Sequence, residues 1–412
     1  MPNGKVAVLE KLSADGPTNS ETPIEIDRIE VVKDAAEMQK LRGFWLSCNP
    51  RRDADPDLFG FLIETRRQDD SPHLFVLRND GAPKALLIGR LARVRLPLKI
   101  GYFRIPSPKL RLLIISYGGW LGEIGEARAT LFIQALRQGL AKGEADAALL
   151  HCPELSSPLA RQALAQPGFF CRDHLIIPDQ HRILDLPAND KGFLAALPQN
   201  ERYQQRKRER RLAKDFKEVR IDRFASPDDV DLLITQAEAV VQKSYQRKIG
   251  VGFAASNFMR AWLVFLAHAG WLRGFVLSLD GRPGAIWIGT LRNGVFVSDY
   301  LAFDPAFADY APGMYLTLKA IEMLAGESSG PARQIDFGGG DGVYKQRLSN
   351  RAVEEAQVHI FAPNFRGLTT NALRSTFGYV NHVLKTQHRN TTWFASAKRM
   401  WRARVTGPHN RP

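Results

Sequence analysis

The sequence has few cysteines and no long apolar run. Its three cysteines, Cys48, Cys152 and Cys171, are too few and too scattered for a disulfide scaffold or a zinc site, so we expect buried thiols in a reducing compartment. The longest apolar stretch, Ala261–Leu272, falls short of the roughly 18 apolar residues that a membrane span needs. The first residues, up to about position 23, lack the apolar core of a secretory signal and predict a polar, poorly ordered lead-in. We therefore expect a cytoplasmic protein.

Acidic residues are missing from one long segment. Between positions 364 and 412 there is no Asp or Glu, against nine Lys or Arg, and the whole chain of 412 residues has a formal net charge of +14. A second basic segment, 201–214, holds seven basic and two acidic residues. Such segments attract nucleic acid, anionic lipid surfaces or phosphorylated small molecules, although a solvated helix face explains residues 201–214 equally well. An RNA contact and a peripheral place at the inner membrane face both stay open.

The remaining composition is that of an ordinary globular protein. At 44% apolar and 24% charged residues, the chain is too apolar for wholesale disorder, and its length suggests two or three domains. The nine histidines form no close cluster along the sequence, so we expect no metal.

One segment of the chain is nearly repeated 200 residues later. Residues 75–91 read FVLRNDGAPKALLIGRL and residues 275–291 read FVLSLDGRPGAIWIGTL, with ten of the seventeen positions identical and no gap. Any hairpin with an Asp-Gly turn shares some of this pattern, but not the same spacing of Pro, Ala and Ile-Gly on the return strand. The match indicates duplication of one architecture.

Hydrophobic periodicity gives both halves the same order of elements. Each half reads as two helices, three antiparallel strands, a helix, a strand, a helix and a strand, which predicts an α/β fold. We expect a lead-in at 1–23, a first domain at 24–187, a second at 188–362 and a basic appendage at 363–412. Each domain should be a mixed, mostly antiparallel sheet flanked by helices.

A glycine run near the end of the second half fits a ligand-binding loop. Residues 335–342, IDFGGGDG, match Asp-x-Gly-x-Gly-x-Gly, by which many methyltransferases hold S-adenosylmethionine. That loop normally opens a doubly wound domain with several further strand–helix units, whereas here only 70 residues come after it. We therefore reject a methyltransferase.

Other segments of the second half carry a resemblance to a known family. They are GWL at 270–272, DGRPGAIWIG at 280–289, FDPAFADYAPG at 303–313 and DFGGGDGVYKQRL at 336–348. Their succession resembles the CelD/FemAB-like branch of the GNAT acyltransferase superfamily, whose members pair two GNAT-fold units. The likeness covers about 200–362 well and the first half more weakly, so the first unit is interpreted as degenerate.

The resemblance implies an acyl-CoA donor, acetyl-CoA or another, held where a central strand separates from its neighbour. The donor's pyrophosphate would cap the helix that begins at Pro312, Gly313 and Met314. Of the family's full pyrophosphate loop only Gly313 survives, and Ala311 replaces a frequent serine. In the first half, GGWLGEIGE at 118–126 carries glutamates that would repel a pyrophosphate.

The resemblance also suggests which side chains carry the chemistry. Tyr344 lies where GNAT enzymes place the tyrosine that protonates the leaving group, and Asp299 is a candidate base. Asp341 is a candidate helix cap or substrate ligand. Lys345 and Tyr245 are further candidates for binding substrate.

The predicted function is transfer of an acyl group from acyl-CoA to an amine on a sugar, a cell-envelope precursor or a small metabolite. Two alternatives stay open. One is FemAB-type aminoacyl transfer from aminoacyl-tRNA, in which 201–214 and 364–412 would contact RNA. The other is a non-catalytic protein that binds an anionic polymer or membrane surface. The oligomeric state is not predicted.

Overall fold

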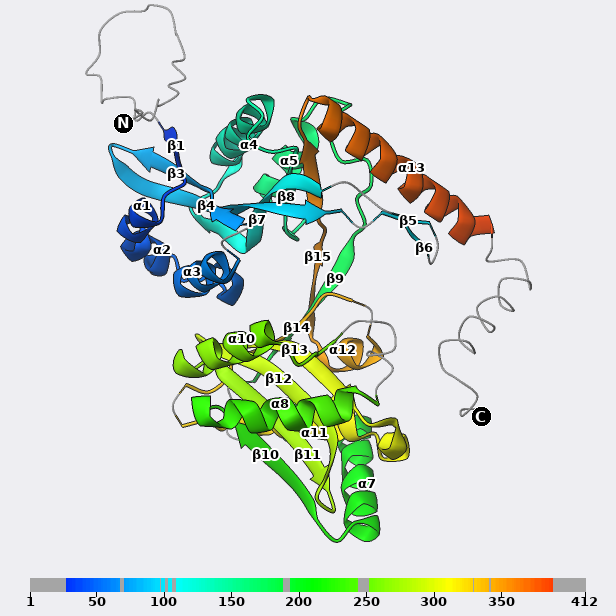
Figure 1. Ribbon diagram of the computed structural model, residues 1–412. Coiled ribbons are helices and arrows are strands. Elements are labelled where there is room, and N and C mark those ends of the chain that lie inside the picture. Colours follow the sequence, from blue (N-terminus) through cyan, green and yellow to red (C-terminus); the bar gives the residue numbers. More distant parts are fainter. Residues whose placement is uncertain are drawn as a thin grey trace, which may run out of the picture. The chain divides into compact units, whose positions relative to one another are not determined.

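The computed structural model divides the chain into two compact units (Figure 1). The structure describes residues 27–66, 70–96, 98–100, 103–105, 109–187, 193–243, 252–328, 330–340 and 342–387. Of these, the first unit comprises 27–178 and 354–387, and the second comprises 179–353. Within the described residues, no helix is long and apolar enough to cross a membrane.

The first unit is built on a seven-stranded sheet with order β1-β3-β4-β7-β8-β16, in which β2 also pairs with β4. Neighbouring strands run antiparallel, except that β7 and β8 are parallel. The strands are β1 (Arg28–Val32), β2 (Asp70–Pro72), β3 (Leu74–Asn79), β4 (Ala82–Arg95), β7 (Lys109–Gly122), β8 (Ala147–Leu150) and β16 (Val358–Phe361), with a separate pair β5 (Leu98–Ile100) and β6 (Phe103–Ile105).

Alternating apolar residues bury both faces of this sheet. Leu74 and Val76 of β3 face one core, which includes Trp45 and Phe59, and Phe75 and Leu77 face the other. The helices that supply the first core are α1 (Ala35–Lys40), α2 (Arg42–Ser47) and α3 (Pro56–Thr65), and those that supply the second are α4 (Glu126–Ala141) and α5 (Pro158–Ala165). The sheet is thus the middle of three layers.

The second unit repeats this arrangement. Its sheet has the order β10-β11-β12-β13-β14-β9-β15, and β13 runs parallel to β14. The strands are β9 (Asp179–Asp185), β10 (Val219–Phe224), β11 (Leu272–Leu279), β12 (Arg282–Arg292), β13 (Val295–Phe303), β14 (Gln334–Gly338) and β15 (Arg351–Glu355).

Helices again cover both faces. Val276 and Ile286 pack into one core with α8 and α10, while Phe275 and Trp287 pack into the other with α6, α7 and α11. The helices of this unit are α6 (Phe193–Ala196), α7 (Gln199–Asp215), α8 (Val230–Val241), α10 (Asn257–His268), α11 (Pro312–Ala325) and α12 (Val343–Leu348). Its short 3-10 turns are η2 (Pro227–Asp229) and η3 (Pro305–Tyr310), whereas η1 (Arg52–Ala54) belongs to the first unit. The predicted α/β class with two mixed sheets flanked by helices is confirmed.

The repeated segment forms the same hairpin in both units. Asp80-Gly81 and Asp280-Gly281 both have positive φ, which suits a tight two-residue turn. The strand register shifts after Leu77 in the first hairpin and after Leu277 in the second. The sequence identity therefore reflects identical local geometry.

The last strand of each half lies in the other unit, which corrects the expected boundaries. The strand 179–185, expected to close the first domain, pairs as β9 with β14 of the second sheet. The strand near 357–362, expected to close the second domain, pairs as β16 with β8 of the first sheet. Alternating or apolar strands of this kind can complete either sheet, because the pattern identifies a strand and not its neighbour.

The start of the basic tail is part of the first unit rather than a free appendage. Residues Phe365–Gln387 form helix α13, and the Asn371 side chain donates to the carbonyls of Phe170 and Arg172 at 2.9 Å each. Arg374 pairs with buried Asp173, which also contacts His359. The rest of the tail lies outside the described residues.

Two buried histidines, His73 and His359, and the half-buried His151 belong to the first unit. Burial lowers the pKa of His73 to about 4, an effect that Lys33 strengthens and Glu144 opposes. Burial also lowers the pKa of His151 and of His359. All three are therefore neutral at pH 7 in the folded protein.

Glycine is required at one position of β4 and at the equivalent position of β12. In β4 and β12 the register shifts at Gly89 and Gly289. A Cβ on Gly89 would lie 2.7 Å from the His73 carbonyl oxygen, and one on Gly289 would lie 2.3 Å from the Val297 carbonyl oxygen. We expect Gly89→Ala and Gly289→Ala to lower the free energy of unfolding by about 1–3 kcal/mol each, measured by denaturant titration.

The matched control is Gly60→Ala, in helix α3, where a Cβ meets nothing within 4 Å. It should be neutral or stabilise by about 0.5–1 kcal/mol. Equal effects of all three substitutions would contradict the steric explanation.

The lowered histidine pKa values indicate that the first unit loses stability in acid. The folded-state pKa of His73 lies below its ordinary value of 6.5. Its contribution to the free energy of unfolding is therefore complete above pH 6.5 and is lost as the pH falls toward 4. The loss should reach about 3 kcal/mol from this residue alone. Denaturant unfolding at a series of pH values measures it, and His73→Gln should flatten the dependence. An unchanged slope in that variant would contradict the assignment.

Candidate active site

The two parallel strands of the second sheet separate at one point. Their pairing runs from Val295 opposite Gln334 to Val297 opposite Asp336, and the described residues show no further pair between them. On the other side of β13, Ser298 pairs with Gly289 and Tyr300 with Ile288, so that Asp299 is an extra residue in a bulge. The separation and the bulge therefore coincide.

The predicted base lies in this bulge. Asp299 is half-buried, and its carboxylate accepts a hydrogen bond of 3.1 Å from the hydroxyl of fully buried Thr290. A bulge commonly redirects a side chain next to a functional site. The position suits a role in proton transfer, but that role stays a prediction.

Helix α11 comes after β13 and presents its N-terminus without a side-chain cap. Pro312 occupies the first turn, and Ala311 before it has φ +49°, a left-handed conformation that is strained for alanine. Pro312 and Gly313 are buried, while Met314 is half-buried. The backbone N–H groups of this turn, together with the positive end of the helix dipole, can hold an anion.

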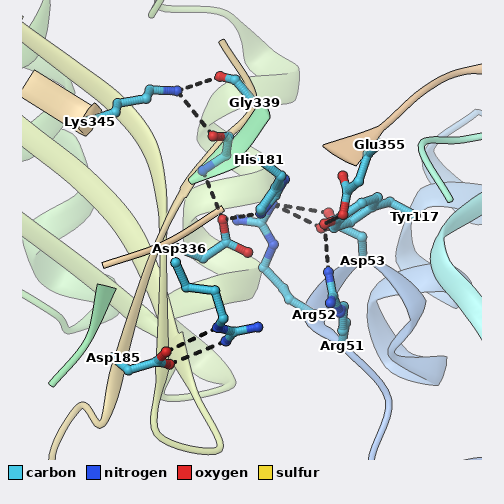
Figure 2. Close-up of polar contacts among 12 residues, drawn as sticks. Arg51, Arg52, Asp53, Tyr117, His181, Asp185, Asp336, Gly339, Lys345 and Glu355 are labelled. Atoms are coloured by element: carbon cyan, nitrogen blue, oxygen red, sulfur yellow. Dashed lines mark hydrogen bonds and ion pairs between the residues drawn. The ribbon is translucent and has the colours of Figure 1, made fainter. Parts of the chain in front are cut away.

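The backbone groups of the glycine run at 338–340 form hydrogen bonds with side chains of the same unit. Gly338 N–H donates to Asp336 at 2.8 Å, and Gly340 N–H donates to Asp179 at 3.0 Å. The Lys345 ammonium donates to the Gly339 carbonyl at 2.5 Å (Figure 2). Because these groups are engaged within the chain, the run is a structural turn between β14 and α12.

Tyr344 is positioned by packing. Its ring lies edge-on to Phe337, with centroids 6.1 Å apart, and burial raises its pKa. Within the described part of the chain, the Tyr344 hydroxyl has no hydrogen-bond partner. A protonated tyrosine at neutral pH can donate a proton to a leaving group.

Two of the predicted substrate ligands lie outside the described residues, namely Asp341 and Tyr245. The third, Lys345, binds glycine carbonyls, and burial lowers its pKa against the opposing effect of Asp179 and Asp336. Its contact with substrate stays a prediction.

Sequence reasoning missed a buried histidine–aspartate pair. His181 Nε2 lies 2.6 Å from Asp336 Oδ1, and both residues are buried (Figure 2). His181 belongs to β9, the strand assigned to the wrong unit, so the sequence carried no signal that would bring it to Asp336. The pair ties β9 to the end of β14 beside the strand separation.

The first unit has a polar cluster at the corresponding point. Pairing of β7 with β8 ends at Ile115, and Tyr117 lies two residues further along the chain. In the second unit Asp299 likewise lies two residues after Val297, where pairing of β13 with β14 ends. The Tyr117 hydroxyl accepts from Arg51 at 2.6 Å and donates to Glu355 at 2.9 Å (Figure 2).

The helix after this strand differs from α11 in charge. Glu126 is the first residue of α4 and pairs with Arg161. Hydrogen bonds from Gln162 and Arg161 lower the Glu126 pKa, so it is ionised at neutral pH. A carboxylate at this end of the helix disfavours a pyrophosphate there. In the described part of the chain, no group of three His, Cys, Asp or Glu side chains could hold a metal ion.

Comparison with known proteins agrees with this geometry. The profile of the Acetyltransferase (GNAT) domain matches residues 199–346. Among curated proteins, none matches the chain significantly.

Three solved structures are similar to the chain at low sequence identity. FemX is 12% identical, with a TM-score of 0.52, over 81% of this chain and 97% of its own. A tandem GNAT protein from the clavulanic acid biosynthesis pathway is 14% identical, with a TM-score of 0.45, over 82% and 99%. The C-terminal domain of a putative lysylphosphatidylglycerol synthetase from Agrobacterium fabrum is 12% identical, with a TM-score of 0.47, over 83% and 96%.

The strand separation, the uncapped helix and the matched profile all fall in the second unit. The second unit thus carries a segment, residues 199–346, that matches the GNAT acetyltransferase domain.

Proposed function

We propose that the second unit transfers an acyl group, most simply acetyl, from acyl-CoA to an amine acceptor. The observation that carries this proposal is the coincidence of the Asp299 bulge with the end of β13–β14 pairing, in the strand that comes before η3 and the uncapped N-terminus of α11. In the GNAT family this is where the donor binds.

The donor's pyrophosphate would accept hydrogen bonds from the backbone N–H groups of Gly313 and Met314. The backbone at Gly313 has space around it, since the nearest atom to an added Cβ is a Phe303 side-chain carbon at 3.5 Å. A small side chain would therefore fit, whereas a charged one would occupy the phosphate position.

The chemistry then needs two proton transfers. The acceptor amine attacks the thioester carbonyl, forming a C–N bond, and collapse of the tetrahedral intermediate breaks the C–S bond. Asp299, directly or through water, takes the amine proton, and Tyr344 gives its proton to the thiolate of CoA. Solvent then returns a proton to Tyr344.

The acceptor is an amine on a sugar, a cell-envelope precursor or a small metabolite, a range that rests on the family. We propose that the first unit does not bind donor and has a structural or acceptor-shaping role. The carboxylate of Glu126 at the start of α4 supports this division.

Aminoacyl transfer from tRNA is the second candidate, favoured by the exposed cations of α7. Backbone phosphate contacts make RNA binding fall steeply as salt rises. RNA-independent turnover with an acyl-CoA would eliminate this candidate.

We expect acetyl-CoA or a longer acyl-CoA, but not S-adenosylmethionine, to raise the thermal midpoint of the protein. Gly313→Glu should abolish the shift, because its carboxylate would lie at the phosphate position. Tyr344→Phe should keep the shift and lower the turnover number at least about 100-fold, because only proton transfer is lost.

The matched control is Gly125→Glu, at the start of α4 in the first unit, where a Cβ meets nothing within 4 Å. It should leave the shift intact. A shift with S-adenosylmethionine alone would overturn the proposed donor, and full turnover by Tyr344→Phe would remove that residue from the mechanism.

A further inference from the structure

Helix α7 presents a strongly basic face to solvent. Arg202, Arg206, Lys207, Arg210 and Lys214 are all exposed on one side of the helix, and all but Lys207 follow i, i+4 spacing. Within the described residues none of the five has an acidic partner. Both acidic residues of the helix, Glu201 and Glu209, are half-buried, and Glu209 lies on the same side as Arg202 and Arg206.

A groove of about 220 Å³ lies beside this basic face. Two exposed arginines of α7, Arg202 and Arg206, form its rim together with Glu209, and Leu194 and Ala195 of α6 contribute apolar surface. The Glu209 carboxylate is neutralised by Lys319, 2.8 Å away. The groove therefore combines cationic donors with an apolar wall.

One buried polar group in the groove is unsatisfied. Gln205 lines the groove and is only 3% exposed. Its carbonyl oxygen accepts from Arg208 at 3.3 Å, while its side-chain nitrogen has no hydrogen-bond partner among the described residues. Burying such a donor without an acceptor is unfavourable, so the site suits a ligand that brings oxygen atoms.

The size and the chemistry of the groove define its ligand. Guanidinium pairs hold phosphate through paired hydrogen bonds, and the apolar wall suits alkyl carbon. Pockets that enclose a whole small-molecule ligand measure roughly 300–1,000 Å³, so this groove would take only part of a larger molecule. Tyr203, 54% exposed on the same helix, is a residue type enriched at membrane–water interfaces.

We propose that α7 binds the surface of an anionic membrane, with one phospholipid phosphate held by Arg202 and Arg206 and its first carbons against Leu194 and Ala195. The other basic residues of α7 supply longer-range attraction to the surface. This binding site goes beyond acyl transfer and does not depend on it.

Vesicle flotation of the full-length protein tests the proposal. The protein should float with phosphatidylcholine vesicles that contain phosphatidylglycerol and not with phosphatidylcholine alone. Arg202→Gln/Arg206→Gln should weaken binding by more than about 25-fold, because each basic residue near an anionic surface contributes a factor of about five and the paired hydrogen bonds to the phosphate are lost as well. Lys207→Gln/Lys214→Gln, which removes the same charge away from the groove, should weaken it less.

A charge-neutral variant separates the groove from the charge. Ala195 is exposed in the groove, so Ala195→Gln should place a polar side chain at its apolar wall, weaken vesicle binding and leave the thermal midpoint unchanged. Tyr344→Phe should float as the wild type does, which keeps this test independent of the proposed chemistry.

Three results would overturn the proposal. They are no flotation with phosphatidylglycerol, equal losses in the two double variants together with full binding by Ala195→Gln, and tighter binding to single-stranded RNA than to the vesicles. The second would mean diffuse charge attraction without a site, and the third would assign the basic face to nucleic acid.

Discussion

The second sheet of this protein depends on one steric constraint, the close backbone contact at Gly289 between β12 and β13. The Val297 carbonyl oxygen lies too near for a side chain at this position, and the register shifts there. In the first sheet Gly89 also lies at a register shift, but its close backbone neighbour is the His73 carbonyl oxygen between β2 and β3. In the second unit the shift leaves Asp299 in a bulge, at the point where β13 stops pairing with β14. The proposed base therefore lies at the register shift that this contact accompanies.

The two units share a glycine at the register shift of the second hairpin strand, and they differ in the polar groups that come after it. Beyond β13 the chain reaches an uncapped helix with strained Ala311 before it, whereas beyond β7 it reaches a helix that starts with Glu126. In place of an aspartate bulge, the first unit has Tyr117 hydrogen-bonded to Arg51 and Glu355. The common scaffold therefore holds different chemistry in each unit, and the donor site is assigned to one unit only.

Sequence reasoning succeeded where local rules decide the structure. The repeated Asp-Gly and Ile-Gly positions predicted the turns and hairpins, and periodicity predicted the helices that cover each sheet. It failed where long-range pairing decides, since β9 and β16 carry strand patterns that do not specify a partner. The His181–Asp336 contact was hidden for the same reason. The glycine run at 338–340 looked like a ligand loop because its partners, Asp179 and Lys345, are brought to it only by the fold.

The central claim is that the second unit alone holds the acyl donor. Amide hydrogen exchange of the full-length protein, with and without acetyl-CoA, tests it most directly, because a ligand protects the backbone groups that it binds. We expect added protection over residues 298–303 and 312–315 and none over residues 116–126. Protection confined to 116–126, or to the glycine run at 338–340, would contradict the claim.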